Sequence, residues 1–186
     1  LGMMVVGSSA KGIDDFTDKA EIVNQDAVAV TSAIGMFEGY EDGSFGPENV
    51  VTRAEMAVII STMLYGAGVN VNQFAETNVF TDVPAWAQGY VNLCSSLGIV
   101  AGVGDGKFDP KANLTREQAA KLVAYLQLGQ KSADALVGGN KFTDVAANRW
   151  SAGYVDYCAT TGVVAGIGNG QFNPTGSLTA LQFGKM

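Results

Sequence analysis

The chain contains no histidine among its 186 residues. Imidazole is the commonest side chain in general acid–base catalysis and a frequent ligand of zinc and other transition metals. Its absence excludes Ser–His and Cys–His nucleophilic centres and histidine-liganded metal sites. Pairs of carboxylates stay open as a catalytic option, but no acidic residue recurs in a way that suggests such a pair, apart from one aspartate considered below. We therefore expect no enzyme, no bound metal and no cofactor.

Basic residues are also scarce, and long apolar runs are missing. The chain has 11 Lys and Arg against 18 Asp and Glu, a net charge of −7, without a basic block. This balance argues against a nucleic-acid partner, because a phosphate backbone is bound by clustered cations. No run is long enough to span a bilayer.

The first residues form an apolar run that ends in small side chains. Residues 1–13 are either the remnant of a secretory signal, with Ser8 and Ala10 at small-residue cleavage positions, or an N-terminal arm that forms a strand.

Only two cysteines are present, Cys94 and Cys158, and they occupy the same position of an internal repeat, where the first copy has Thr31. Small core residues are one interpretation of the two thiols. A disulfide between facing copies of an exported protein is the other.

The repeat has a period of about sixty residues. In each copy a glycine is followed at fixed spacing by Gly, Phe, Pro and Thr, and no spacing slips by a residue. The three sets are Gly35-Gly43-Phe45-Pro47-Thr52, Gly98-Gly106-Phe108-Pro110-Thr115 and Gly162-Gly170-Phe172-Pro174-Thr179. We expect repeats at 14–66, 80–129 and 142–186, joined by linkers at 67–79 and 130–141, with the third copy cut short at its C-terminal end.

Each copy is predicted to contain two helices around a loop. The first helix follows Phe-Thr-Asp, and its apolar positions recur at helical spacing. We expect these positions to be Trp86, Tyr90, Leu93, Cys94 and Leu97 in copy two, Trp150, Tyr154, Tyr157, Cys158 and Thr161 in copy three, and Val23, Ala27, Val30, Thr31 and Ile34 in copy one.

Gly35, Gly98 and Gly162 fit the left-handed residue that ends such a helix. An Asp-Gly or Asn-Gly turn follows, with a phenylalanine plugging the core beneath it. The second helix begins at Thr52, Thr115 and Thr179, each followed three residues later by Glu or Gln in a capping box.

One helix–loop–helix is too small to bury its apolar faces alone. The sequence therefore predicts an all-α fold in which three helix–loop–helix repeats pack around a common axis and leave grooves between neighbours.

Two arginines stand where helix electrostatics disfavours a cation. Arg53 and Arg116 occupy the first helical position of the second helix, at the positive end of the macrodipole, which costs a few tenths to about 1 kcal/mol. Beside free backbone N–H groups, such an arginine makes a receptor for a carboxylate or phosphate. The alternative is a salt bridge to an acid such as Asp18 or Asp82. Copy three has Ala180 at this position, where Arg149 is either a substitute or a solvated surface residue.

Two further residue types have both a structural and a ligand-binding interpretation. Trp86 and Trp150 lie near the start of the first helix, either as core aromatics or as flat faces for stacking on a sugar ring. The aspartates of the three Phe-Thr-Asp motifs either cap the first helix or accept bonds from sugar hydroxyls. They are Asp18, Asp82 and Asp144.

These motifs together resemble S-layer homology domains in three tandem copies over about residues 14 to 186. The resemblance implies a pseudo-threefold, three-pronged α-helical bundle that anchors exported proteins non-covalently to the bacterial cell wall. It implies a secondary cell-wall polysaccharide carrying pyruvate ketals as the ligand, bound in grooves between repeats. Arg53 and Arg116 then contact the ketal carboxylate. The groove-lining positions correspond to Trp86, Trp150, Gly39, Gly102 and Gly166.

Departures from the family pattern limit the number of complete grooves. Copy one has Val23 in place of the tryptophan, and copy three has Ala180 in place of the arginine, so at most two grooves are expected to be fully equipped. A different class of function is a structural subunit that self-assembles into a surface layer or filament, which an ordered Leu1–Ala10 arm favours. A cargo domain outside this sequence is compatible with either.

Overall fold

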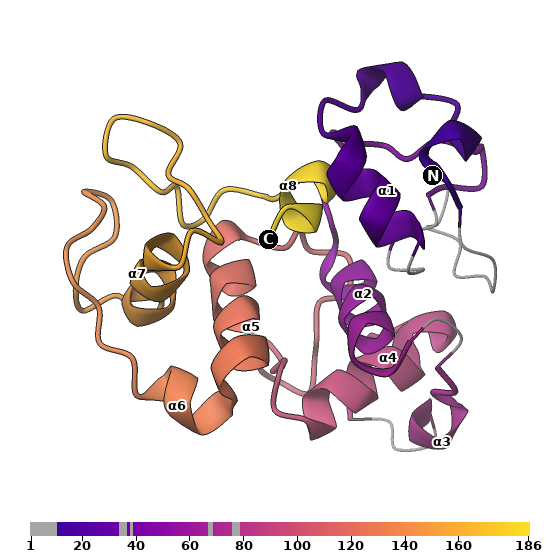
Figure 1. The fold of residues 1–186 in the computed structure, drawn as a ribbon. Helices are drawn as coiled ribbons and strands as arrows, with labels where there is room; N and C mark the ends of the chain where they lie inside the picture. Colours follow the sequence, from indigo (N-terminus) through magenta and orange to yellow (C-terminus); the bar gives the residue numbers. More distant parts are fainter. Residues whose placement is uncertain (1–10, 34–36, 38, 67–68, 76–78) are drawn as a thin grey trace. The chain divides into compact units, whose positions relative to one another are not determined.

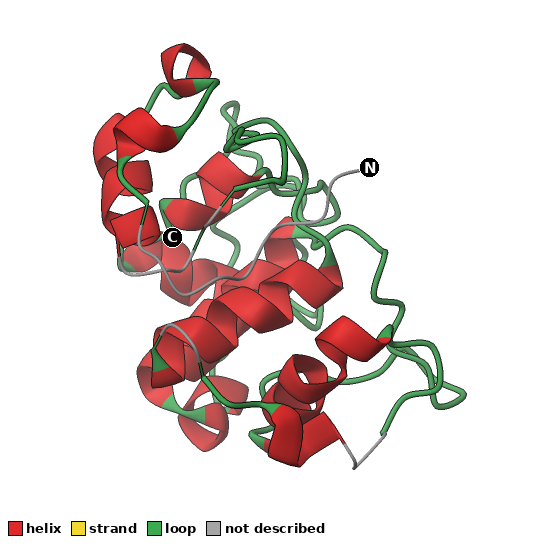
Figure 2. Ribbon diagram, turned by 90° about the vertical axis from the view of Figure 1, so that its right-hand side faces the viewer, coloured by secondary structure: helices red, strands yellow, loops and turns green. Residues whose placement is uncertain are grey.

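The fold was analysed in a computed structural model that describes residues 11–33, 37, 39–66, 69–75 and 79–186. Two 3-10 helices, Ile13–Asp15 and Lys19–Glu21, precede the first α-helix. The α-helices labelled in Figure 1 are α1 Gln25–Ala33, α2 Arg53–Tyr65, α3 Asn72–Ala75, α4 Ala85–Ser96, α5 Arg116–Leu128, α6 Gln130–Asp134, α7 Ala152–Thr160 and α8 Ala180–Gly184. Over these described ranges Figure 2 shows helices and loops without a strand, which confirms the all-α prediction.

The chain divides into two compact units that do not coincide with single repeats. Unit 1 extends to Ala112 and also includes Thr179–Lys185, while unit 2 comprises Asn113–Leu178 and Met186. In unit 1, α2 and α3 pack on α4, and α8 packs on α1. In unit 2, α5 packs on α6 and α7. The second helix of one repeat therefore pairs with the first helix of another repeat.

Small side chains line the face that α4 buries. Ala87, Val91 and Cys94 are fully buried at helical spacing, whereas Trp86 and Leu97 are 38% and 40% exposed. The predicted apolar face was therefore partly wrong, because Trp86 and Leu97 flank the contact instead of filling it. Small residues at the centre let two helix backbones approach closely, and Ala57 and Ser61 serve α2 in the same way.

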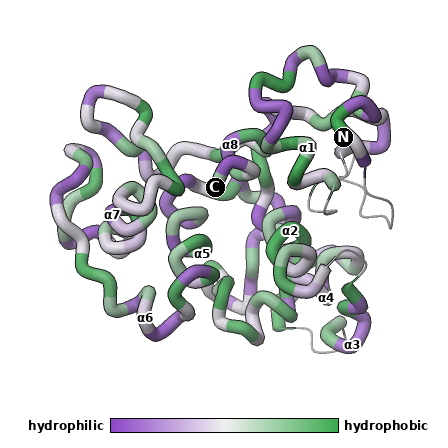
Figure 3. The backbone as a smooth tube through the Cα atoms, viewed as in Figure 1, coloured by the Kyte–Doolittle hydropathy of each residue, from purple (hydrophilic) through white to green (hydrophobic). Residues whose placement is uncertain are grey.

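The first copy shows the same error more clearly. Val23 and Val30, which were predicted to face the core, are 86% and 62% exposed. Val28 is buried in their place, and it is the counterpart of the buried Val91 and Val155. Figure 3 shows α2 coloured mainly as hydrophobic and α6 as hydrophilic, in line with the burial of α2 along most of its length.

The loops hold a phenylalanine beneath each turn, as predicted. Phe45, Phe108 and Phe172 are at most 1% exposed. Each ring contacts the phenylalanine of the Phe-Thr-Asp motif in its own copy, with ring centroids 5.3–5.4 Å apart. Isolated bridges, Gly104 with Lys107 and Gly168 with Gln171, close two of the turns.

Helix ends and linkers follow the sequence signals where the structure describes them. Gly98 and Gly162 have φ of 70° and 77° just beyond α4 and α7, the left-handed conformation expected at a helix end. The corresponding Gly35, and the segment Leu1–Ala10, lie outside the described residues. The linkers contain the short helices α3 and α6. None of the described helices is long and apolar enough to cross a membrane.

Both cysteines are free and buried. Cys94 Sγ lies 3.5 Å from the carbonyl oxygen of Ala57, and Cys158 Sγ lies 3.3 Å from that of Ala120. The core interpretation of the two thiols therefore applies to this structure.

Candidate ligand-binding sites

The second helix of each repeat begins with the predicted capping box. Thr52, Thr115 and Thr179 each accept a bond from the backbone N–H three residues later, and the Glu or Gln at that place bonds back to the threonine N–H. These bonds satisfy two of the N–H groups that a helix start leaves without an intrahelical partner.

Carbonyl oxygens from another repeat satisfy the remaining N–H groups. Arg53 N donates to Ala112 O at 2.9 Å, and Ala54 N donates to Pro110 O at 3.1 Å. The equivalent bonds join Arg116 to Gly176, Glu117 to Pro174, Ala180 to Asn49 and Leu181 to Pro47. The expectation of free N–H groups beside the arginines was therefore wrong. These helix starts are occupied by the proline turn of a neighbouring repeat.

Each arginine side chain binds the loop that carries this turn. Arg53 Nε donates to Phe108 O and Nη2 to Ala101 O, both at 2.9 Å. Arg116 repeats the pattern on the third copy, with Phe172 O and Ala165 O both 2.7 Å away. Each guanidinium also lies over a phenylalanine ring, 4.3 Å from the centroid of Phe108 and 4.6 Å from that of Phe172. The arginines therefore fasten the loops as well as carrying charge.

Neither arginine side chain is in direct contact with an acid in the part of the chain that the structure describes. Among the described residues, neither guanidinium forms an ion pair, and Nη1 of each has no hydrogen-bond partner. Burial lowers the pKa of Arg53, although Asp109 and Asp82 act in the opposite direction. Burial likewise lowers the pKa of Arg116 against the effect of Asp144. The predicted alternative of a direct salt bridge is thus not found among the described residues, and the nearby carboxylates act on each guanidinium without contacting it.

The aspartates of the Phe-Thr-Asp motifs do not cap helices. Asp82 accepts from Phe108 N at 2.8 Å and from Asp109 N at 2.9 Å, one bond to each carboxylate oxygen. Asp18 and Asp144 each accept two backbone N–H bonds from the loop of their own copy in the same way. The capping interpretation was wrong because the loop presents two N–H groups side by side, which a carboxylate fits better than a single helix terminus.

The three predicted loop glycines are required by close packing. A Cβ on Gly39 would lie 2.4 Å from Ser44 O, and one on Gly102 would lie 2.6 Å from Lys107 O. Gly166 meets Gln171 O at 2.6 Å. Each also faces the ring of the nearby motif phenylalanine, so a larger residue would push the loop off its support. The structure thus gives them a packing role, and a ligand contact stays a prediction.

The two tryptophans are exposed. Trp86 is the second residue of α4 and is 38% exposed, while Trp150 lies in the turn before α7 and is 54% exposed. The core interpretation of these side chains is therefore wrong. Part of each indole is therefore accessible at the surface.

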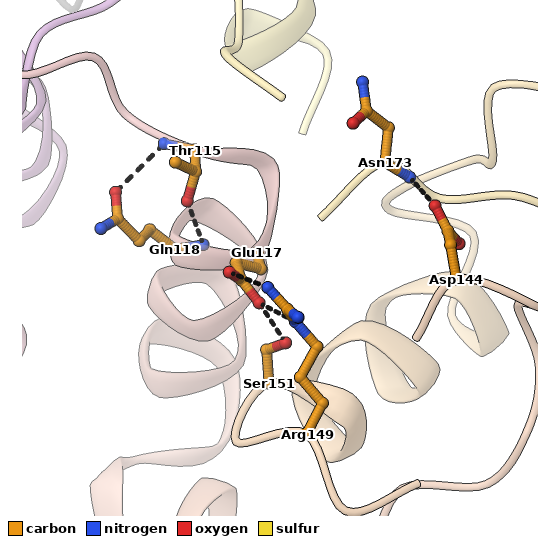
Figure 4. Close-up of polar contacts among 7 residues, drawn as sticks. All are labelled: Thr115, Glu117, Gln118, Asp144, Arg149, Ser151 and Asn173. Atoms are coloured by element: carbon orange, nitrogen blue, oxygen red, sulfur yellow. Dashed lines mark hydrogen bonds and ion pairs between the residues drawn. The ribbon is translucent and has the colours of Figure 1, made fainter. Parts of the chain in front are cut away.

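A partly buried ion pair in unit 2 was missed by sequence reasoning. Glu117, the residue after Arg116, is 5% exposed and forms a fork-like pair with Arg149, with Nε–Oε2 at 2.7 Å and Nη2–Oε1 at 2.8 Å. The Ser151 hydroxyl donates to the same carboxylate. Figure 4 shows the three side chains converging between α5 and the turn before α7.

Arg149 is therefore neither a solvated surface residue nor a substitute for the missing arginine of copy three. The bond to Glu117 raises the pKa of Arg149. A signal was present in the sequence, because Glu117, Arg149 and Ser151 stand where the preceding pair of helices has Ala54, Ala85 and Ala87.

No group of three or more Cys, Asp or Glu side chains in the described part of the chain is placed to hold a metal ion. The features available to a ligand are therefore the two guanidinium groups, the exposed indoles and the loop carboxylates.

Comparison with known proteins gives three matches to one family. A sequence model of the S-layer homology domain matches residues 15–57, 79–120 and 141–181. A cell surface protein of Thermoanaerobacter kivui is 34% identical over 88% of this chain and 20% of its own length. A cellulosome-anchoring protein of Acetivibrio thermocellus is 29% identical over 67% of this chain and 28% of its own.

An amylopullulanase of Thermoanaerobacterium thermosulfurigenes is 29% identical over 88% of this chain but only 9% of its own length. The chain thus spans less than a third of the length of each of these relatives.

Proposed function

Because the chain belongs to the S-layer homology domain family, we propose that it anchors an exported protein non-covalently to the bacterial cell wall. The proposed ligand is a secondary cell-wall polysaccharide that carries pyruvate ketals. The ketal carboxylate is held by Arg116 and Arg53, and a neighbouring sugar ring stacks on Trp150 or Trp86. The names of the relatives, a cell surface protein and a cellulosome-anchoring protein among them, support a location at the cell surface.

The observation that carries this proposal is that neither arginine forms a direct ion pair with an acid among the described residues. Two donors of each guanidinium are used by loop carbonyls, and a carbonyl does not neutralise a cation. The Nη1 donors are left for a ligand, and a carboxylate is their best acceptor. An ordinary sugar hydroxyl would leave the charge in place, so the acidic substituent of the glycan is the group that the site favours.

We propose that the three junctions between repeats differ in how tightly they bind the ligand. Arg116 is more exposed than Arg53, which is 8% exposed, and the nearby Trp150 is the more open indole. Ala180 offers no guanidinium to the loop of the first copy. We assign the strongest site to unit 2, a weaker one to Arg53 and none to Ala180. A pseudo-threefold, three-pronged arrangement of the repeats is part of this proposal.

The chain is proposed to act as a binding module rather than as a catalyst. Its relatives include an amylopullulanase, of which it matches only a small share. We propose that catalytic activity, where a protein of this kind has one, belongs to a cargo domain attached to the module.

The direct test is binding to wall polysaccharide before and after chemical removal of the pyruvate ketals. We expect the chain to be retained on native polysaccharide and largely lost from the depyruvylated material. Arg116→Ala should weaken binding by about 1.5–3 kcal/mol, the range for a hydrogen bond to a charged group. Isothermal titration calorimetry with the soluble polysaccharide measures the change.

Two variants separate charge from fold. Lys131→Ala removes one exposed positive charge from α6, away from the proposed site, and should bind as wild type. Arg116→Lys keeps the charge but loses the two-point contact with Phe172 O and Ala165 O, and should fall between wild type and the alanine variant. Equal retention on native and depyruvylated polysaccharide would rule out the carboxylate as the recognised group.

A further inference from the structure

Three residues that differ between the two helix pairs form one connected network. In unit 1 the positions are Ala54 on α2 and Ala85 and Ala87 on α4, and Ala54 and Ala87 are at most 2% exposed. In unit 2 they are Glu117, Arg149 and Ser151, which bind one another directly. The three differences between the units therefore lie at one contact, between the start of α5 and the turn before α7. Replacing a buried ionic contact by apolar packing is often neutral or stabilising, so stability alone does not account for the network.

Two residues of this network are the immediate sequence neighbours of the exposed Trp150. Arg149 and Ser151, the residues before and after Trp150, are both bound to the single carboxylate of Glu117. Glu117 is itself fixed, because it is buried on the first turn of α5 and its N–H donates to Pro174 O. The backbone that carries Trp150 is therefore tied to α5 at two successive points.

The indole ring has a third support. Its centroid lies 6.4 Å from that of Tyr154, and the Tyr154 ring lies 6.0 Å from that of Tyr125. The Tyr154 hydroxyl donates to Asp134 at 2.7 Å, and the Tyr125 hydroxyl donates to the same oxygen. This row of rings limits the rotation of Trp150 while leaving 54% of it exposed. In unit 1, Thr62 stands where unit 2 has Tyr125, so no aromatic ring is present at that place.

We propose that Glu117 is a positioning residue that holds Trp150 as a rigid platform for a sugar ring next to the carboxylate held by Arg116. Glu117 acts through Arg149 and Ser151 and does not touch the ligand. A platform that is already ordered loses little conformational entropy when a ligand binds, and this raises affinity without any new contact. The inference rests on the proposed function, and it explains why unit 2 is the stronger site.

The sequence itself supplies the matched variant. Glu117→Ala/Arg149→Ala/Ser151→Ala recreates the alanines that unit 1 carries at the same places, where Ala54 and Ala87 are buried and Ala85 is exposed. Both the variant and its parent also carry Trp86→Phe. Trp150 is then the only tryptophan left in the chain, which has two. The probes are the soluble pyruvylated polysaccharide and the fluorescence anisotropy decay of Trp150.

We expect the triple variant to bind about five- to tenfold more weakly, mainly through faster dissociation. Before ligand is added, its Trp150 should show faster local motion than that of the parent, and this difference should disappear at saturation. A residue with only a structural role would lower the melting temperature without changing Trp150 motion. Unchanged affinity together with unchanged anisotropy decay overturns the inference.

Two further variants keep the outcome interpretable. Trp150→Ala in the same background measures the whole contribution of the platform, and the loss in the triple variant should be a part of it. If the triple variant does not unfold cooperatively, Arg149→Lys gives the same comparison, because it keeps the charge but not the fork. A parent that does not bind contradicts the proposed function, whereas a parent and triple variant that bind alike contradict only the role of Glu117.

Discussion

Each loop carboxylate accepts two backbone N–H groups, one on each oxygen. For Asp82 the donors are Phe108 N and Asp109 N, more than twenty residues away in the sequence. The bond from Phe108 is the main cause that lowers the pKa of Asp82. For Asp144 burial acts to raise the pKa, and the bonds from Phe172 and Asn173 bring it below the ordinary value. The three carboxylates hold the loops onto their own copies, and from the lowered pKa values of Asp82 and Asp144 we expect the fold to lose stability in acid.

We predict that Asp82→Asn makes stability less dependent on pH in the acid range. A carboxyl whose pKa is lower in the folded state stabilises the fold above its ordinary pKa of 3.8, and this contribution is lost as the pH falls through that value and then through the folded pKa. The variant should be less stable than wild type at pH 7 but should lose less stability between pH 5 and about 2. Urea midpoints followed by circular dichroism at several pH values measure this. Parallel pH curves for the two proteins would contradict the assignment.

At the scale of the helices, local signals were read correctly and contacts between repeats were not. The Thr-x-x-Glu/Gln boxes predicted the starts of α2, α5 and α8 because both partners lie within one turn. The acceptors for the next N–H groups come from the following repeat, or from the first repeat in the case of α8. Helical periodicity alone does not show that Val28 faces the core while Val30 is exposed, because that depends on how close the partner helix approaches.

The candidate site shows the same limit. The arginines and exposed tryptophans could be selected from the sequence by their position and type. The loop carbonyls that bind Arg53 could not be identified in this way, and neither could the ion pair of Arg149 with Glu117. Each of these contacts needs two segments that only the fold brings together.

Removal of one cap should destabilise the helix that it begins. Thr115→Ala leaves Gln118 N without its side-chain acceptor and breaks the reciprocal capping box at the start of α5. We expect a loss of about 1 kcal/mol in the free energy of unfolding. Thr115→Ser keeps the hydroxyl and should lose much less. Urea unfolding followed by far-ultraviolet circular dichroism compares the three proteins, and equal stability of the alanine and serine variants would exclude the hydroxyl as the cap.

At the scale of the whole molecule, the two cysteines serve as reporters of unfolding. Each lies in the buried contact of one unit, Cys94 in unit 1 and Cys158 in unit 2. Burial raises the pKa of each thiol to about 11, so neither is a reactive thiolate at neutral pH.

We predict that both thiols resist a thiol reagent such as Ellman's reagent at pH 8 in the native protein and react at once in urea. The melting temperature should not change on addition of a reducing agent, because no disulfide contributes to the fold. Cys158→Ala leaves only Cys94 and reports on unit 1, whereas Cys94→Ala leaves only Cys158 and reports on unit 2. Rapid reaction of either thiol in native conditions would contradict its burial.

The pairing of α1 with α8 also has a consequence for folding kinetics. These two helices belong to opposite ends of the described chain, yet they complete the same unit. During synthesis α1 emerges before α8, so the contact between the two helices forms only after α8 has followed. Contacts this distant in sequence close slowly. Unit 2 is continuous apart from one residue, so it is free to fold before the contact between α1 and α8 completes unit 1.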